Sequence, residues 1–224
     1  MNHYQTAAFT KAIKMKQSPF SGIFPPNVSA RCNNAAVELF GNTGEYVAQI
    51  KFGGTHVMIH TNGKEVEIRT TTGQRLPMLE NHPNIDFKGL ALTGNWYCFM
   101  GTYLNKGLYN EKGTKERNRL VIWDVLVWDG AMLTGKTSPD RLALLRCDAM
   151  IETKYFLATQ YTGILVSPYY TGQFKTLWES IQHPTLFEGI ILKQKSTTLQ
   201  PPLQELSNSE GMIKCRKETL LYKY

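Results

Sequence analysis

Cationic side chains stand at the ends of two strand-like segments of the sequence. Lys51 closes the run EYVAQIKF and precedes two glycines, Gly53 and Gly54. Lys214 and Arg216 lie two residues apart in IKCRK, so both side chains project from one face of a strand. A lysine amine can attack phosphorus, and two cations opposite it can stabilise the charge that develops on a phosphate. These residue types therefore point to chemistry at a nucleotide phosphate.

A third strand-like segment, EGIILK, adds a carboxylate to these cations. Glu188 is followed by Gly189, and alternation along a strand places Lys193 on the face opposite Glu188. Taken alone, each segment also fits an ordinary structure: an exposed strand-end lysine beside a glycine bulge, a plain strand start, or a solvated basic strand end. Their order and spacing together favour a phosphate-binding site.

The strand that ends at Lys51 must position the lysine away from the core. Its alternate residues Tyr46, Ala48, Ile50 and Phe52 form an apolar set that we expect to face the core. The other face, with Val47, Gln49 and Lys51, then points toward a cleft or solvent. We expect Gly53 and Gly54 to allow a positive φ or a close approach to a ligand, and Asn62-Gly63 to form a tight hairpin turn.

The rest of the chain alternates short β-branched runs with Gly, Asn and Pro, a pattern typical of sheets with a few helices between them. We expect polar loops over 105–118 and 196–211. Helices are predicted over 2–16, 138–152 and 171–182. Strands are predicted over 96–104, 119–130, 187–194 and 212–224.

The length allows one large domain or a domain with a small appendage, and we expect a single domain over residues 1–224. The charge favours a polyanionic partner, although solubility alone could also explain it. The chain has 42% hydrophobic residues, a net charge of +7 and a pI near 9.2. No apolar run is long enough to cross a bilayer, and the N-terminus shows no secretory signal, so no membrane partner is expected.

The cysteines are far apart in the sequence and form no Cys-x-x-Cys pair, which argues against structural zinc. They are Cys32, Cys98, Cys147 and Cys215. Scattered thiols suit a reducing compartment, so we expect free cysteines and a cytoplasmic location, or the host-cell cytoplasm if the protein is viral.

The ordered motifs resemble those of the covalent nucleotidyltransferases, which include ATP-dependent DNA ligases, RNA ligases and mRNA capping enzymes. The resemblance runs from about residue 45 to the C-terminus. It rests on KFGG at 51–54, Arg69, VIWDVL at 121–126, EGIILK at 188–193 and KCR at 214–216. It implies an α+β fold with two antiparallel sheets and flanking helices around a nucleotide cleft. This would be a ligase-type adenylation domain with no OB-fold appended.

At the phosphate end of the cleft, the resemblance assigns the nucleophile to Lys51, which attacks the α-phosphate of ATP to give a lysyl-AMP. Nearby cations and desolvation would favour the neutral amine that this attack needs. Glu188 matches the carboxylate that helps hold Mg²⁺ or Mn²⁺. Lys214 and Arg216 match the basic pair that contacts the α-phosphate. The resemblance also implies that Lys193, at the end of EGIILK, helps bind the nucleotide.

At the base end, the resemblance places Gln49 and the backbone of Ile50 near adenine. Arg69 matches an arginine that lies near the ribose or a bound 5′-phosphate. Trp123 falls where the family stacks an aromatic ring on the base, although a buried core tryptophan is an equally good interpretation of that position.

Three positions depart from the family pattern. Gly53 stands where Asp, His or Asn is usual, His56 where Arg or Asn is frequent, and Thr102 where a glutamate contacts the ribose or metal. They leave two hypotheses open. The first is an ATP-dependent ligase core that seals 5′-phosphate to 3′-hydroxyl ends of DNA or RNA. The second is a catalytically degenerate nucleic-acid-binding module of the same fold. A capping guanylyltransferase is a third, weaker possibility.

For the ligase hypothesis, the expected cofactors are ATP and Mg²⁺ or Mn²⁺. The expected partner is nucleic acid with a nick or a 5′-phosphorylated end. A partner protein is a further expectation, as the source of the missing OB-fold.

Overall fold

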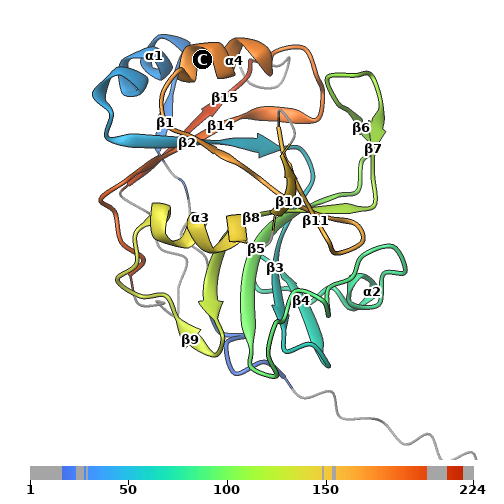
Figure 1. The fold of residues 1–224 in the computed structure, drawn as a ribbon. Helices are drawn as coiled ribbons and strands as arrows, with labels where there is room; N and C mark the ends of the chain where they lie inside the picture. The colour runs from blue at the N-terminus through green and yellow to red at the C-terminus, as the bar shows by residue number, and fades with distance from the viewer. Residues whose placement is uncertain are drawn as a thin grey trace, which may run out of the picture.

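The computed structural model describes residues 17–23, 28, 30–147, 149–152, 155–200 and 211–218. The helix expected over 2–16 lies outside these residues. The described chain forms two large sheets with helices beside them (Figure 1), which confirms the predicted α+β class. None of its helices combines the length and the apolar character needed to cross a membrane.

The five-stranded sheet carries the strand that ends near Lys51. Its strands in order are β1 (Ala30–Cys32), β15 (Met212–Arg216), β14 (Phe187–Gln194), β2 (Tyr46–Phe52) and β13 (Tyr169–Tyr170). All neighbours in it are antiparallel except β1 and β15, which run parallel.

The eight-stranded sheet lies below it in Figure 1. Its strands in order are β10 (Ala149–Glu152), β11 (Leu157–Thr159), β12 (Ile164–Val166), β8 (Arg119–Trp128), β5 (Tyr97–Leu104), β3 (Thr55–Thr61) and β4 (Val66–Thr70), with β9 (Ala131–Met132) paired to β8. β12 and β8 are parallel, so each large sheet departs from the expected antiparallel pattern at one pair.

Two helices cover the outer face of the five-stranded sheet. α1 (Asn34–Thr43) and α4 (Phe174–Ser180) lie side by side there (Figure 1). Asn33 caps α1, since its Oδ1 accepts a hydrogen bond from the Ala36 amide at 3.1 Å, and Gly44 ends the helix in the left-handed conformation. The short α2 (Pro77–Glu80) follows β4, and α3 (Ser138–Cys147) packs against β8.

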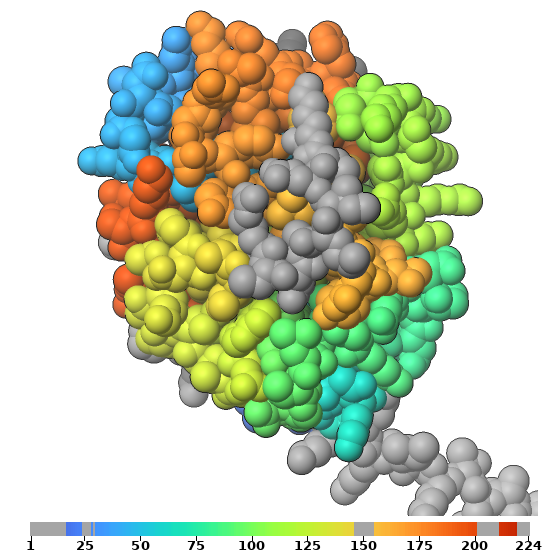
Figure 2. All heavy atoms as spheres, in the orientation of Figure 1, coloured from blue at the N-terminus to red at the C-terminus, as the bar shows by residue number. Residues whose placement is uncertain are grey.

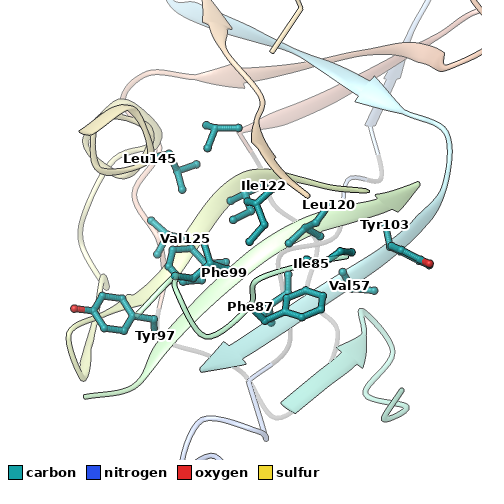
Figure 3. Close-up of a cluster of buried hydrophobic side chains, with 14 of the residues drawn as sticks. Val57, Ile85, Phe87, Tyr97, Phe99, Tyr103, Leu120, Ile122, Val125 and Leu145 are labelled. Carbon is teal, nitrogen blue, oxygen red and sulfur yellow. The ribbon is translucent and has the colours of Figure 1, made fainter. Parts of the chain in front are cut away.

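Each sheet has its own apolar core. The alternation predicted for β2 is confirmed, because Ala48, Ile50 and Phe52 pack with residues of α1 and α4. Figure 3 shows the second core, on the eight-stranded sheet, where Phe99, Ile122 and further buried side chains pack together. The face of β2 that carries Gln49 and Lys51 is thereby left for a site between the sheets.

Two predicted segments differ in the structure. The loop expected over 105–118 contains a two-stranded hairpin, β6 (Leu108–Tyr109) with β7 (Lys115–Glu116), whose strands are too short to give a periodic pattern. The helix expected over 138–152 ends at Cys147, since residues 149–152 pair with β11 as strand β10. The strands over 96–104, 119–130 and 187–194 are confirmed, as is the hairpin at Asn62-Gly63.

The expectation of free cysteines is wrong for two of them. Cys32 and Cys215 form a disulfide, although 183 residues separate them in the sequence, while Cys98 is a buried free thiol. The parallel pairing of β1 with β15 places the two cysteines directly opposite each other, with their Cα atoms 5.1 Å apart. The two cysteines meet only because β1 and β15 are neighbours in the sheet, so the spacing of cysteines along the chain could not predict the disulfide.

A buried polar cluster lies on the eight-stranded sheet below the cleft. His60 is fully buried, with Nδ1 at 3.3 Å from Ser18 Oγ. Glu67 accepts a hydrogen bond from the Ser18 amide at 2.9 Å and pairs with Arg69. Burial lowers the pKa of His60 to about 4, with Glu67 opposing and Arg69 reinforcing the shift. This cluster joins the segment 17–23 to the sheet.

The neutral His60 makes stability depend on pH. Between its ordinary pKa of 6.5 and about 4, the unfolded chain binds a proton that the folded chain does not. The free energy of unfolding should therefore fall as pH drops through this window, by about 3 kcal/mol from this residue. Compared with the wild-type protein, His60→Gln should show a flatter dependence on pH. Urea unfolding across the window measures both, and an equal slope in His60→Gln would contradict the assignment.

Candidate active site

A cavity of about 370 Å³ lies between the two sheets. The five-stranded sheet contributes side chains from β2, β14 and β15, and the eight-stranded sheet contributes side chains from β3, β5 and β8. The residues that line it are Val28, Gln49, Ile50, Lys51, Phe52, His56, Thr71, Thr72, Met100, Thr102, Trp123, Ile191, Lys193, Met212 and Lys214. The cavity thus gathers most of the residues singled out in the sequence.

Lys51 is buried at one end of this cavity, with 8% of its side chain exposed. Its Nζ donates a hydrogen bond to Glu188 Oε2 and lies 3.2 Å from His56 Nε2. Neither of the two glycines that follow Lys51 adopts a positive φ. They are needed because neighbouring groups leave no room for a side chain. A Cβ on Gly54 would collide with the Tyr103 carbonyl oxygen, and one on Gly53 would lie 2.6 Å from Leu108 Cδ1. The sequence suggested a close approach to a ligand, whereas the two glycines allow a close approach to β5 and the β6–β7 hairpin.

Glu188 reaches Lys51 because of a β-bulge. Phe187 pairs with Phe52 and Gly189 with Lys51, so Glu188 is an extra residue between two ladder positions. The prediction that Lys193 and Glu188 occupy opposite faces is consequently wrong, since Lys193 lines the cavity and Glu188 reaches Lys51, which lines it too. Gly189 makes the bulge possible, with φ of 152° and no room for a Cβ against the Cys215 carbonyl oxygen.

The charges around Glu188 keep it ionised. Burial alone would raise its pKa, but the hydrogen bond and charge of Lys51, followed by Arg216 and His56, outweigh burial and lower the pKa. Arg216 Nη2 lies 3.6 Å from Glu188 Oε2. The carboxylate is therefore an ionised oxygen acceptor between Lys51 and Arg216.

Two of the positions that depart from the family pattern form a pair. His56 Nδ1 lies 3.1 Å from Thr102 Oγ1, while His56 Nε2 faces Lys51. Burial, then the charge of Lys51, lowers the pKa of His56 to about 4 despite the opposing charge of Glu188. The imidazole is therefore neutral at pH 7 and can accept one hydrogen bond while donating another.

A third cation, Arg31, lies near Lys214 and Arg216. The parallel pairing of β1 with β15 sets Arg31 opposite Lys214. Burial, followed by the charges of Arg216, Lys51 and Arg31, lowers the pKa of Lys214. The motifs did not point to Arg31, because β1 precedes them and its partner strand lies far along the chain.

The other end of the cavity can bind a base. Gln49 Nε2 donates a hydrogen bond to the Ser167 carbonyl oxygen at 3.2 Å, and its buried Oε1 has no hydrogen-bond partner among the described residues. Trp123 lines the same end, with Lys193 Nζ 5.2 Å from the ring centroid and the His56 ring edge-on at 6.4 Å. Ile50 reaches the cavity but packs mainly in the core under α1 and α4.

Solved structures share this arrangement of sheets. The chain superimposes on mycobacterial DNA ligase D complexed with ATP and MES with a TM-score of 0.63, 17% sequence identity and coverage of 88% of this chain. For the ligase domain of LigD from M. tuberculosis the TM-score is 0.60 at 17% identity, again over 88% of this chain. The chain has the ligase-type nucleotidyltransferase fold.

The match is to part of a longer protein. This chain spans 61% of the length of each of those two chains. At the level of sequence, no family model matches and no curated protein matches. The similarity is therefore one of fold, and the chemistry has to be argued from the residues in the cavity.

Lys193 has a structural partner in this ligase-type domain. Its Nζ lies 3.5 Å from Asp124 Oδ2, and Asp124 also accepts hydrogen bonds from Arg141 Nε and Nη2 at 3.0 Å each. At most 2% of each of these side chains is exposed. Burial is the largest effect on Lys193 and lowers its pKa, with Asp124 opposing it. Lys193 thus borders the base end as part of a buried ion cluster.

Three predicted site residues do not line the cavity: Glu188 and Arg216, which pair with each other beside Lys51, and Arg69. Arg69 has partners of its own on β4. It pairs with Glu67 on β4, and its Nη1 donates to the Gly73 carbonyl oxygen at 2.9 Å. Thr71 and Thr72, which follow on the same segment, line the cavity instead. In this arrangement Arg69 supports the turn that places these two threonines.

Proposed function

We propose that the protein is the catalytic core of an ATP-dependent polynucleotide ligase. The observation that carries this proposal is the placement of Lys51 in a cavity with cations at one end and a base site at the other. Lys214 lines the phosphate end beside Arg216, and Gln49 lies at the base end. This order matches the layout of a nucleoside triphosphate whose α-phosphate meets the lysine.

Gln49 supports ATP over GTP. Because its Nε2 donates to the Ser167 carbonyl, its Oε1 is left as an acceptor without a partner among the described residues. A buried acceptor without a donor costs about 1–3 kcal/mol, and the exocyclic amino group of adenine would supply that donor. Guanine presents a carbonyl oxygen at the corresponding position, which would face another acceptor.

The proposed first step transfers AMP to Lys51. The Lys51 ammonium first releases one proton to solvent. The lone pair of the neutral Nζ then attacks the α-phosphorus, a bond forms between nitrogen and phosphorus, and the bond from phosphorus to the bridging oxygen of the β-phosphate breaks. Pyrophosphate leaves with that electron pair and takes up the proton that Nζ loses. Lys214 and Arg216 stabilise the charge on the α-phosphate oxygens. His56 accepts a hydrogen bond from Nζ and is held by Thr102.

Glu188 fits a magnesium role only together with a substrate. The described residues contain no cluster of three or more His, Cys, Asp or Glu side chains that could hold a metal alone. Mg²⁺ usually takes one or two carboxylates and completes its shell with phosphates and water. Glu188 would therefore hold Mg²⁺ or Mn²⁺ with the triphosphate, and the ion would neutralise phosphate charge.

The second part of the proposal is the sealing of a 5′-phosphate to a 3′-hydroxyl in DNA or RNA. The net charge of +7 supports a nucleic-acid substrate.

A degenerate nucleic-acid-binding module is the second candidate. Thr102 is buried, carries no carboxylate and has its hydroxyl hydrogen-bonded to His56. If the position must provide a carboxylate ligand for metal, a neutral hydroxyl is a poor substitute for a hard divalent cation. The module would keep the cavity and the basic surface without forming a lysyl-AMP.

Covalent labelling separates these candidates. The purified protein should become labelled by α-³²P ATP with Mg²⁺ or Mn²⁺, and only weakly by α-³²P GTP. γ-³²P ATP is the matched control, because its label leaves with pyrophosphate. Equal labelling by GTP would favour a capping-type enzyme. No labelling with either metal would favour the degenerate module.

A further inference from the structure

The β6–β7 hairpin, residues 105–118, presents an exposed basic surface at the edge of the molecule (Figures 1 and 2). Its four cations are exposed, and none forms an ion pair with another described residue: Lys106, Lys112, Lys115 and Arg117. Of its two carboxylates, Glu116 is buried and pairs with Arg119 at 3.1 Å. Glu111 alone opposes the four positive charges on the exposed side.

The turn of the hairpin is ordered by its own hydrogen bonds. Asn110 Oδ1 accepts from the Lys112 amide at 3.0 Å and from the Thr114 amide at 2.9 Å. The Asn110 amide donates to the Thr114 carbonyl at 2.9 Å, and its Nδ2 donates to Glu116 at 2.9 Å. The cations are therefore carried on a defined scaffold, which reduces the entropy lost when they bind a partner.

The hairpin is attached directly beside Lys51. The Leu186 amide donates to the Tyr109 carbonyl at 3.0 Å, and the Gly53 amide donates to the Leu186 carbonyl at 2.8 Å. The Tyr109 amide also donates to Thr185 Oγ1 at 2.9 Å, while Leu108 packs against Gly53. A nucleic-acid strand that reaches Lys51 from this side must therefore pass the hairpin.

Tyr109 adds an aromatic ring to this surface. The residue is 51% exposed. Its backbone is nevertheless fixed, because its amide and its carbonyl both form hydrogen bonds with the 185–186 segment. An exposed ring among cations suits stacking with a nucleobase next to phosphate contacts. An acidic protein partner could pair with the four cations, but it would offer no base on which the Tyr109 ring could stack.

We propose that the β6–β7 hairpin binds the sugar–phosphate backbone of the nucleic-acid strand whose end enters the site, with Tyr109 stacking on a base. The proposal rests on the proposed ligase function. It assigns the positioning of nucleic acid to a surface outside the nucleotide cavity, so adenylation of Lys51 should not require it.

The test neutralises the hairpin and measures two separate properties. In K106Q/K112Q/K115Q/R117Q, labelling by α-³²P ATP should stay within twofold of wild type. Affinity for a 5′-phosphorylated nicked duplex should fall at least tenfold at low salt. The slope of log affinity against log salt should become shallower by about 3 to 4, in line with four lost phosphate contacts. Matched DNA and RNA duplexes show which backbone the hairpin prefers, and Tyr109→Ala should weaken binding further.

The matched control removes four exposed charges elsewhere, in K64Q/K88Q/K136Q/K175Q. It should lose less than threefold in affinity. Equal losses in the two variants, or no binding by wild type, would overturn the proposal, as would loss of labelling together with binding. Fluorescence anisotropy reports binding whether or not Lys51 is adenylated. An unlabelled wild type that still binds through the hairpin would therefore contradict the ligase function alone.

Discussion

Replacing Lys51 with arginine is expected to reduce covalent labelling by ATP below detection. Arginine keeps the positive charge and can still pair with Glu188, but its guanidinium stays protonated and offers no nucleophilic nitrogen. The cavity and the fold should therefore survive, while the bond between nitrogen and phosphorus cannot form. The loss should be complete, because no other lysine occupies the same place beside Glu188 among the described residues.

The measurement is the rate of α-³²P ATP labelling, followed by peptide mapping of the labelled wild type. Lys195→Arg is the matched control, since Lys195 donates to the Gly44 carbonyl away from the cavity and should keep normal labelling. Labelling of Lys51→Arg at the wild-type rate, or a mapped label on another residue, would refute the nucleophile. Urea unfolding of both variants checks that the fold is retained.

Removing the Asp124 carboxylate should produce the largest loss of stability. Asp124→Ala leaves Arg141 and Lys193 buried without their shared anion, and breaking a buried ion cluster in this way costs about 3–5 kcal/mol. Asp124 also accepts a hydrogen bond from the Val125 amide at 2.8 Å. Urea unfolding followed by tryptophan fluorescence gives the change. A loss below about 1 kcal/mol would contradict the predicted role.

Two further variants make the Asp124 experiment specific. Glu111→Ala removes an exposed carboxylate and should change stability by less than about 0.5 kcal/mol. Lys193→Met in the Asp124→Ala background removes one of the two unpaired cations and should recover part of the loss. Because Lys193 Nζ also lies over the Trp123 ring, ATP binding should weaken in Asp124→Ala even where the protein remains folded.

The sequence predicted which residues share one face of a strand better than it predicted which strands pair with each other. Alternation in EYVAQIKF placed Gln49 and Lys51 on one face of β2, and the structure confirms it, because regular strands obey a period of two. The same rule failed at Glu188, where a bulge adds a residue to β14. A bulge depends on the partner strand, which alternation within one strand does not contain.

Contacts that depend on the order of strands in a sheet could not be predicted from the sequence. Arg31 stands beside Lys214, and Cys32 joins Cys215, because β1 lies parallel to a strand from the far end of the chain. The pairing of His56 with Thr102 likewise depends on the register between β3 and β5. The helix α1 was not predicted, although Asn33 and Gly44 are typical helix boundaries.

The place of β15 inside the five-stranded sheet constrains the order of events during translation. This strand lies between β1 and β14, yet it is the last of the described strands to leave the ribosome. Until Arg216 has been synthesised, β1 lacks its partner and β14 keeps an open edge, which is a template for wrong pairing with other chains. Lys214 and Arg216 arrive with the same strand, so a nascent chain cannot assemble the phosphate end of the cavity early. Any chemistry at Lys51 that needs these two cations is thereby restricted to chains whose five-stranded sheet has closed.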